Sequence, residues 1–480
     1  MNKRISIVAM PVVAMVLNAP AFAFAQDTPV PVQCLATSLD NTRQIPTVGR
    51  EIQQWVTADG ARVTFVHAPE LPMFDLSVSF AAGSSRDGNT PGLAGLVNGM
   101  LNEGTADKDA QAIAEGFDNV GAIFHNPIDR SRSTITLRSL SSAAARKASI
   151  ELFTQAISAP TFPDKALQQV KHQIIEIIKI DQSSTWKKVT DQIYSHIYEG
   201  HPYSNPKFGT TESVASVTQE QLRDFHRKAY TARNSAIAII GDLTRVQAEE
   251  IATLISSSLP PGPALPPLAS IGTVEPEIYH YEAQSPLINM GVALPSIGVD
   301  HPDFAALQVA SQIFGGDGHI SRLQAELRDR RGLSYSATSG FEANSIGSVF
   351  IIETEVEPRF GDSTMDLIEE LFRAYLTEGP TEQELDDAKR YLAAAMALNF
   401  GDNESTLKRL RTMANHGLPA DYYAKLQTQY QQMTLDQVKQ TMAKHFDPEG
   451  LVYITVGPSV EQVPLPAPLT RPAAVACVNN

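Results

Sequence analysis

The chain has few cysteines, no long apolar run beyond its N-terminus and no excess of basic residues. Only two of its 480 residues are cysteine, Cys34 and Cys477, and because each lies in a terminal segment, nothing in the sequence suggests thiol catalysis. Past Ala25 no apolar run reaches the length, roughly 18 residues or more, that a membrane-spanning helix needs. Fifty-three acidic residues against 38 basic ones give a net charge of −15. An anionic surface repels nucleic-acid phosphates and anionic lipid, so neither is the expected main ligand.

The N-terminal segment up to Ala25 has the pattern of a secretory signal peptide. Lys3 and Arg4 precede the apolar stretch Ile5–Leu17, and Ala23-Phe-Ala25 offers an A-x-A cleavage site. This pattern predicts an exported protein of a bacterial periplasm. In such an oxidising compartment the two cysteines either form a disulfide or remain two free thiols, and the sequence leaves both open.

A repeat divides the rest of the chain. Val217–Asp242 aligns without gaps to Met433–Pro458 at an offset of 216, with Thr218 matching Thr434. Two further stretches upstream match at offsets of 218 and 219. Similarity at nearly one offset indicates a duplicated unit of about 218 residues.

The predicted domains follow from this repeat and from a proline-rich run that begins at Leu259, which favours a stiff, extended linker. We predict a signal peptide at 1–25, a first half at 26–258, a linker at 259–275, a second half at 276–460 and a tail at 461–480. Residues 74–80 alternate between apolar and polar, as in a strand with one buried face, whereas 145–156 and 381–398 have helical patterns. The expected fold class is α+β, with each half an antiparallel sheet packed with helices on one side. The two halves would face each other across a cavity and form half of a clamshell.

The segment 90–105 (TPGLAGLVNGMLNEGT) is predicted to form a helix that Thr90 caps. One face is apolar, and the other carries Gly95, Asn98 and Gly99. Two glycines inside a helix cost roughly 1 kcal/mol each relative to alanine. Either the small residues admit another backbone closely, or the face once carried chemistry and has lost it.

This segment resembles the pitrilysin/insulinase family of zinc peptidases, in its two-domain, processing-peptidase-like branch, whose pattern is G-L-A-H-x-x-E-H-M-L-x-x-G-T. Gly95 and Gly99 stand at the two histidine positions and Asn98 at the glutamate position. Glycine has no side chain to ligate zinc, and a neutral amide is no general base. Glu176 follows Gly99 at the spacing of the family's third ligand, but one carboxylate does not hold a catalytic zinc. The resemblance therefore implies a family member without a metal, in which Glu176 is either a relic of the site or a structural residue.

The second half retains another motif of the family. Arg331 and Tyr335, in the sequence RGLSY, match the R-x-x-x-Y pair that reaches the substrate opposite the zinc. A guanidinium and a phenol can hold a peptide carbonyl or polarise an oxyanion. The alternative is a solvated arginine cluster followed by a core strand that starts at Tyr335. Gly315–Gly318, just upstream, indicates a tight turn rather than a phosphate-binding loop.

A lost zinc motif with a retained Arg/Tyr pair is the pattern of the family's heterodimeric members. The resemblance thus implies a zinc-binding homologous partner, a peptide substrate and no cofactor in this chain. Substrates of the family add a strand at the edge that corresponds to Ala122–Thr136, where Pro127 lacks the N–H needed for the ladder. Two alternatives are a binding or assembly scaffold and a self-sufficient hydrolase. The second would need a new metal site, and the closest histidine pair, His196 and His201, lies on different helical faces.

Overall fold

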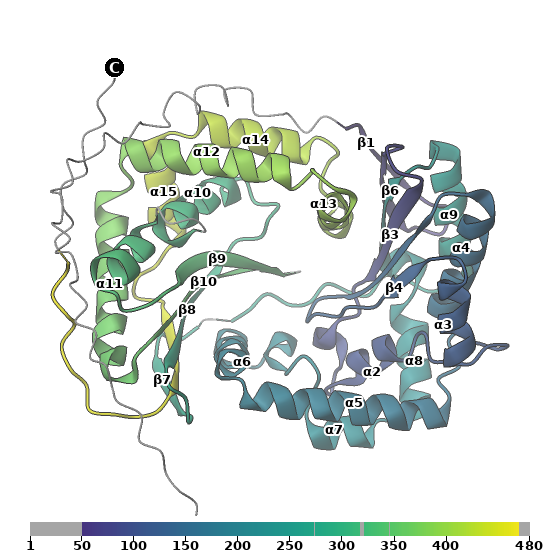
Figure 1. Ribbon diagram of the computed structural model, residues 1–480, viewed down its shortest axis with the longest axis horizontal. Coiled ribbons are helices and arrows are strands. Elements are labelled where there is room, and N and C mark those ends of the chain that lie inside the picture. Colours follow the sequence, from purple (N-terminus) through teal and green to yellow (C-terminus); the bar gives the residue numbers. More distant parts are fainter. Residues whose placement is uncertain (1–49, 273, 317–320, 345, 470–480) are drawn as a thin grey trace, which may run out of the picture. The chain divides into compact units, whose positions relative to one another are not determined.

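The computed structural model describes residues 50–272, 274–316, 321–344 and 346–469 (Figure 1). The predicted signal peptide, Cys34 and Cys477 lie outside the described residues. Among the helices that are described, none combines the length and the apolar character needed to cross a bilayer.

The first half forms, within the described residues, a six-stranded sheet in the order β1-β2-β6-β3-β5-β4. Its strands are β1 Ile52–Val56, β2 Arg62–His67, β3 Met73–Phe80, β4 Ile123–His125, β5 Ser133–Leu140 and β6 Ser235–Gly241. Strands β2 and β6 pair in parallel, and the other neighbours are antiparallel.

The second half forms a five-stranded sheet in the order β7-β11-β8-β10-β9, again within the described residues. Its strands are β7 Ile278–Glu282, β8 Ile288–Ser296, β9 Ala337–Asn344, β10 Gly347–Val356 and β11 Val452–Gly457. Here β7 and β11 are the parallel pair. The order equals that of β2-β6-β3-β5-β4, so the expected α+β fold of two like halves is confirmed. Each sheet is mixed rather than purely antiparallel, because the last strand of each half, β6 or β11, runs parallel to an early strand of that half, β2 or β7.

Helices surround both sheets. In the first half they are α2 Leu93–Gly99, α3 Ala110–Asp118, α4 Ala143–Ser158, α5 Asp164–Ser183, α6 Thr185–Ile197, α7 Thr211–Ser216, α8 Gln219–Ala229 and α9 Arg245–Ser258. In the second half they are α10 Phe304–Gly315, a π-helix Gln324–Arg330, α11 Gly361–Glu378, α12 Glu382–Leu398, α13 Asn403–His416, α14 Tyr422–Gln432 and α15 Leu435–His445.

The repeat recognised in the sequence has a structural counterpart. Thr218 and Thr434 begin α8 and α15 with the same capping box, in which the threonine side chain accepts the N–H of Gln221 or Gln437. Helix α8 then leads into β6, and α15 leads into β11. Each of these two strands has a parallel neighbour, β2 for β6 and β7 for β11. Equal caps in front of equal strands explain why this stretch aligns without gaps.

Each sheet is covered by a helix from the other half. Helices α4 and α9 pack on one face of the first sheet, and α13 packs against β2, β3 and β6 on the opposite face (Figure 1). In return α6, from the first half, packs against β8 and β11. The alternation in β3 predicts one exposed face, but its polar residues are buried as well, and the Ser79 hydroxyl donates to Asn415 Oδ1 at 2.5 Å. The covering helix comes from the other half of the sequence, so the local pattern could not show it.

The end of α13 also anchors the first sheet. Arg62 Nε donates to the carbonyl of Ala414 at 2.9 Å, and Arg132 donates to that of Asn415 at 2.9 Å. The last carbonyls of a helix have no partners within it and carry partial negative charge, so two arginines are well placed there. Burial lowers the pKa of Arg132 to about 10.

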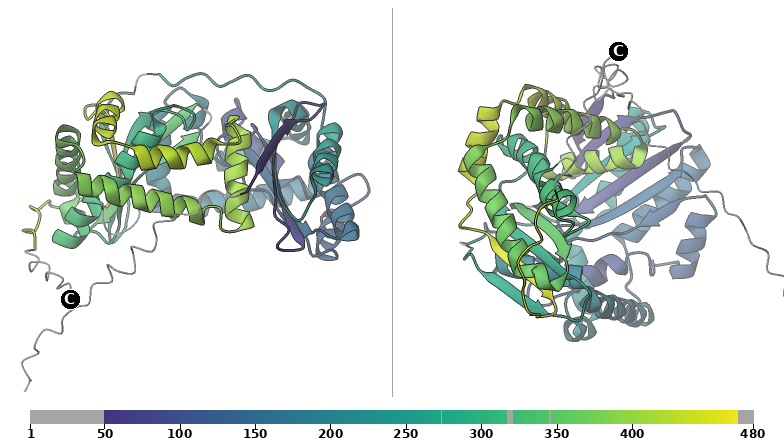
Figure 2. Two further views of the ribbon diagram at one scale, coloured as in Figure 1. Left: turned by 90° about the horizontal axis from the view of Figure 1, so that it is seen from above. Right: turned by 60° about the vertical axis from the view of Figure 1, so that its left-hand side comes forward.

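The linker lies along the first half rather than apart from it (Figure 2). Residues 260–277, apart from the undescribed 273, contain neither helix nor strand. Arg86 donates to the carbonyl of Pro266 at 2.8 Å, and His201 Nε2 bonds to that of Ala269 at 3.1 Å. The prolines keep the chain extended, and these bonds fix its course.

Candidate functional site

Helix α2 begins at Leu93, two residues later than a helix capped by Thr90 would. The Asp87 carboxylate, not Thr90, caps it and accepts the N–H groups of Gly92 and Ala94, both at 2.7 Å. Gly92 has φ +93, and a Cβ there would lie 2.6 Å from the Phe208 carbonyl oxygen, so only glycine fits. Burial raises the pKa of Asp87 to about 7. The helix is also shorter than expected and ends at Gly99.

The face of α2 that carries the glycines is filled by neighbouring side chains. A Cβ on Gly95 would lie 3.2 Å from the Phe208 ring, and one on Gly99 would lie 3.1 Å from Val170 Cγ1 of α5. These distances are tighter than ordinary van der Waals contact, so even a methyl group requires a neighbour to shift. The glycines therefore admit side chains of α5 and of the loop around Phe208.

Asn98, between the glycines, belongs to a buried polar network. Its Nδ2 donates to Ser133 Oγ at 2.8 Å, and the Tyr230 hydroxyl donates to the same oxygen at 2.7 Å. Asn98 is 3% exposed, and Ser133 and Tyr230 are fully buried. The Asn126 side chain donates to the Asn98 carbonyl at 2.7 Å, which joins α2 to the end of β4. Asn98, which stands where the general base of the family is expected, is thus engaged in hydrogen bonds within the protein.

Glu176 does not take part in this arrangement. It lies on α5, six residues beyond Val170, and hence about 120° away from it around the helix. Its carboxylate pairs with Lys179 at 2.7 Å and is 46% exposed, and this pairing lowers the pKa of Glu176. We find no metal ligand at Gly95, Asn98 or Gly99, and the one carboxylate expected nearby is engaged at the surface.

A groove of about 640 Å³ lies beside β4, the edge strand of the first sheet. We call it the β4 groove. It is lined by Asp75, Ile123, His125, Asn126, Pro127, Thr136, Leu137 and Arg138 from the first half, and by Glu404, Leu407, Lys408 and Arg411 of α13. Both signs of charge are present, and Asp75 and Arg138 form an ion pair at 2.6 Å. Because Asn126 bonds to α2, the groove and the helix form one site.

The free edge of the groove is short. Strand β4 has three residues, and Pro127, which follows it closely, has no N–H and gives its carbonyl to Thr134 at 2.9 Å. A peptide that adds to this edge can therefore pair with Ile123–His125 alone.

Arg331 and Tyr335 lie in the loop between the π-helix and β9. Arg331 donates to the carbonyl of Pro466, in the C-terminal segment, at 3.0 Å. Its buried Nε has no hydrogen-bond partner, and Glu326 lies 3.8 Å away. The Tyr335 side chain is 79% exposed, and the Arg328 guanidinium lies 4.9 Å from its ring centre. Tyr335 is thus open to another molecule, whereas the C-terminal segment occupies Arg331.

Comparison with known proteins decides the family. Residues 62–211 match the family described as insulinase (peptidase family M16), and residues 216–392 match the one described as peptidase M16 inactive domain. A solved structure described as the peptidase M16 inactive domain from Pseudomonas fluorescens is 40% identical and has a TM-score of 0.84. It covers 86% of this chain and 100% of its own. The chain belongs to the M16 family.

The M16 relatives carry different names. A protein of Helicobacter pylori named non-peptidase homolog YmxG is 24% identical over 394 residues, which are 80% of this chain and 89% of the relative. A protein of Mycobacterium leprae named as an uncharacterized zinc protease is 27% identical over 392 residues, 79% of this chain and 86% of the relative. M16 membership therefore does not by itself decide between peptidase and non-peptidase.

Sequence reasoning found the M16 helix and the edge strand but missed the side of the groove that α13 forms. Glu404, Lys408 and Arg411 have the ordinary helical spacing of a solvated face, and they belong to the other half. Burial lowers the pKa of Arg411, as expected for a guanidinium turned into the protein. His196 and His201 are structural: His196 bonds to the Tyr281 hydroxyl at 2.8 Å, and His201 holds the linker.

Proposed function

We propose that this M16 chain is a non-catalytic subunit, without a catalytic zinc of its own, that binds peptide and completes the active site of a zinc-binding M16 partner in the periplasm. The observation that carries the proposal is the closed face of α2. Gly95 and Gly99 face Phe208 and Val170, and Asn98 is bound to Ser133. A hydrolytic zinc needs three protein ligands and a base for its water, and this face supplies none of them.

The loop that carries Arg331 and Tyr335 would be this subunit's contribution to the shared site. Arg331 already holds a backbone carbonyl, that of Pro466, at 3.0 Å. The same geometry suits the carbonyl of a bound peptide or the oxyanion formed from it. The exposed Tyr335 offers a second donor four residues on. In the assembled enzyme, substrate would replace the C-terminal segment on Arg331.

Export to the periplasm is proposed from the segment 1–25, where two basic residues precede an apolar stretch and an A-x-A site. The partner would be exported as well, and it would supply the catalytic zinc.

Affinity purification of the tagged mature chain from the periplasm of its own host tests the pairing. We expect a stoichiometric M16 partner that carries H-x-x-E-H, and zinc-dependent peptide turnover by the pair. Recovery of the chain alone, with no turnover after any M16 homologue of that host is added, would contradict the proposal.

Variants of the pair then test the roles. Arg331→Ala and Tyr335→Ala should each lower kcat by about 100-fold, the usual effect of removing one oxyanion donor. The matched control is Arg330→Ala, which removes the neighbouring guanidinium, paired with Glu326, and should leave kcat unchanged. If all three variants behave alike, Arg331 has no special role.

A second candidate, a peptide-binding or assembly scaffold, is favoured by the β4 groove. Its volume and mixed charges suit an extended peptide without any chemistry. This candidate predicts that the isolated chain binds peptide, that Lys408→Ala and Arg411→Ala weaken the binding, and that Arg331→Ala does not.

A further inference from the structure

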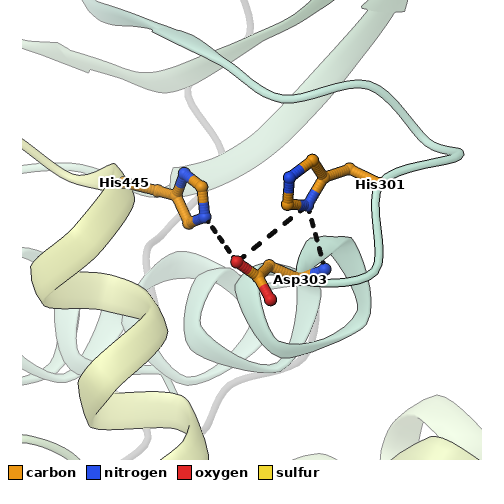
Figure 3. A group of neighbouring side chains, drawn as sticks. All are labelled: His301, Asp303 and His445. Carbon is orange, nitrogen blue, oxygen red and sulfur yellow. Dashed lines mark hydrogen bonds and ion pairs between the residues drawn. The ribbon is translucent and has the colours of Figure 1, made fainter.

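Three metal-ligating side chains meet in the second half, on elements that form neither α2 nor the β4 groove (Figure 3). His301 and Asp303 lie in the loop that leads from β8 into α10, and His445 is the last residue of α15. His445 Nε2 lies 2.8 Å from Asp303 Oδ2, and His301 Nδ1 lies 4.0 Å from the same oxygen. One ligand atom from each of the three lies within 4.8 Å of the others. The packing of α10 on α15 brings the segments together across 142 residues of sequence, so no local spacing could reveal the group.

We propose that His301, Asp303 and His445 bind one divalent transition-metal ion of the zinc type. Ligand atoms at about 2.0–2.1 Å from a tetrahedral zinc lie roughly 3.4 Å apart, between the two distances to Asp303 Oδ2 observed here. Two imidazoles and one carboxylate suit zinc, cobalt or nickel, whereas calcium and magnesium prefer oxygen ligands alone. The side chains of His301 and Asp303 are 37% and 28% exposed, so a water molecule can complete the tetrahedron.

Three interactions compete with the ion. The hydrogen bond between His445 Nε2 and Asp303 Oδ2, at 2.8 Å, is given up when both atoms bind the metal. Lys444 Nζ lies 2.7 Å from Asp303 Oδ2, but its side chain is 62% exposed and can turn into water. The backbone N–H of Asp303 donates to His301 Nδ1 at 3.0 Å, so metal binding at this nitrogen costs one ordinary hydrogen bond.

The ion would tie the start of α10 to the end of α15. Both helices contribute to the same hydrophobic core, through Leu307 and Val438 among others. A cavity of about 200 Å³, lined in part by Asp303 and Gln437, lies beside the Asp303 side of the site. The expected consequence is a second half that is more stable with metal than without.

Equilibrium dialysis of the whole mature chain tests the proposal, after chelator treatment and then exposure to Zn²⁺. We expect one ion per chain, a higher Tm with zinc, and a tetrahedral absorption spectrum when Co²⁺ is used instead. His445→Ala and the more exposed His301→Ala should both lose the ion. The matched control, His172→Ala on the exposed surface of α5, should keep it.

Lys444→Ala separates a metal site from a simple charge cluster. Without the competing ammonium, the variant should bind zinc at least as tightly as the wild type does. A gain of about ten-fold in affinity would correspond to about 1.4 kcal/mol of binding free energy. Failure of the wild-type chain to bind zinc, or equal binding by the wild type and both histidine variants, would overturn the proposal.

Discussion

Introduction of the expected zinc motif, H-x-x-E-H, on α2 should destabilise the protein without creating a zinc site. The perturbation is the triple variant Gly95→His, Asn98→Glu and Gly99→His, compared with Gly95→Ala and Gly99→Ala. The alanine variants gain about 1 kcal/mol each in helix propensity. They need only small shifts of Phe208 and Val170, because the new Cβ atoms lie 3.2 and 3.1 Å from these side chains. Each alanine variant should therefore lie within about 1 kcal/mol of the wild type.

The histidines lack this freedom. Each imidazole extends beyond a Cβ that is already in tight contact, and overpacking of this kind costs roughly 1–3 kcal/mol at each position. Asn98→Glu removes the donor to Ser133 and places a carboxylate where the wild-type side chain is 3% exposed. A buried hydrogen bond lost in this way costs a further ~1–3 kcal/mol. The sum is a large share of the about 5–15 kcal/mol that typically stabilises a protein.

Urea unfolding midpoints of the five single variants and the triple variant measure these costs. Zinc content is measured in a His445→Ala background, so that bound zinc reports on α2 alone. A triple variant that keeps the wild-type midpoint and binds one zinc ion per chain would refute the reasoning. The face of α2 would then be open, and the argument for a non-catalytic subunit would lose its basis.

Two further predictions concern buried polar groups. Ser133→Ala leaves the donors of Asn98 and Tyr230 without an acceptor and should lower the free energy of unfolding by about 2–4 kcal/mol. Tyr230→Phe removes one donor and should lower it by about 1 kcal/mol. Urea unfolding of both variants measures the difference. Burial lowers the pKa of His226, which bonds to the Ile157 carbonyl, from 6.5 to about 4. Its unfolded form takes up a proton first, so stability is full above pH 6.5 and should fall by about 3 kcal/mol towards pH 4. Unfolding at pH 7 and pH 4.5 measures this loss, and His226→Gln should reduce it.

The sequence predicts best what local periodicity and the repeat determine. The alternation in residues 74–80 places β3, and the pair Thr218 and Thr434 places the two capped helices and the strands behind them. The parallel pairs could not be predicted, because alternation shows which side chains share a face but not the direction of the neighbouring strand. The burial of Ser79 depends on α13, whose position is decided by tertiary packing alone.

In the candidate site too, the sequence predicts the residue types but not the contacts that tertiary packing creates. The sequence shows that Gly95 and Gly99 have no side chains to bind a metal, but it does not show which side chains fill the space, Phe208 and Val170. For Arg331 the chemistry was predicted, whereas its bond to Pro466 depends on a segment 135 residues further along the chain. Residue types thus indicated what each position can do, and only the fold indicated which partner each one has.

Helix α6 of the first half packs on the second sheet, and α13 of the second half packs on the first sheet. This mutual packing limits how a partner could associate. One core combines Val66 and Ile240 of the first sheet with Leu410 of α13, and another combines Val189 and Ile193 of α6 with strands of the second sheet. Removal of either half would expose a full sheet face, at roughly 25 cal/mol for each Å² of apolar surface returned to water. Neither half can then be replaced by a half of another chain without loss of these cores. The proposed heterodimer would therefore form between complete subunits, through surfaces that the described contacts leave free.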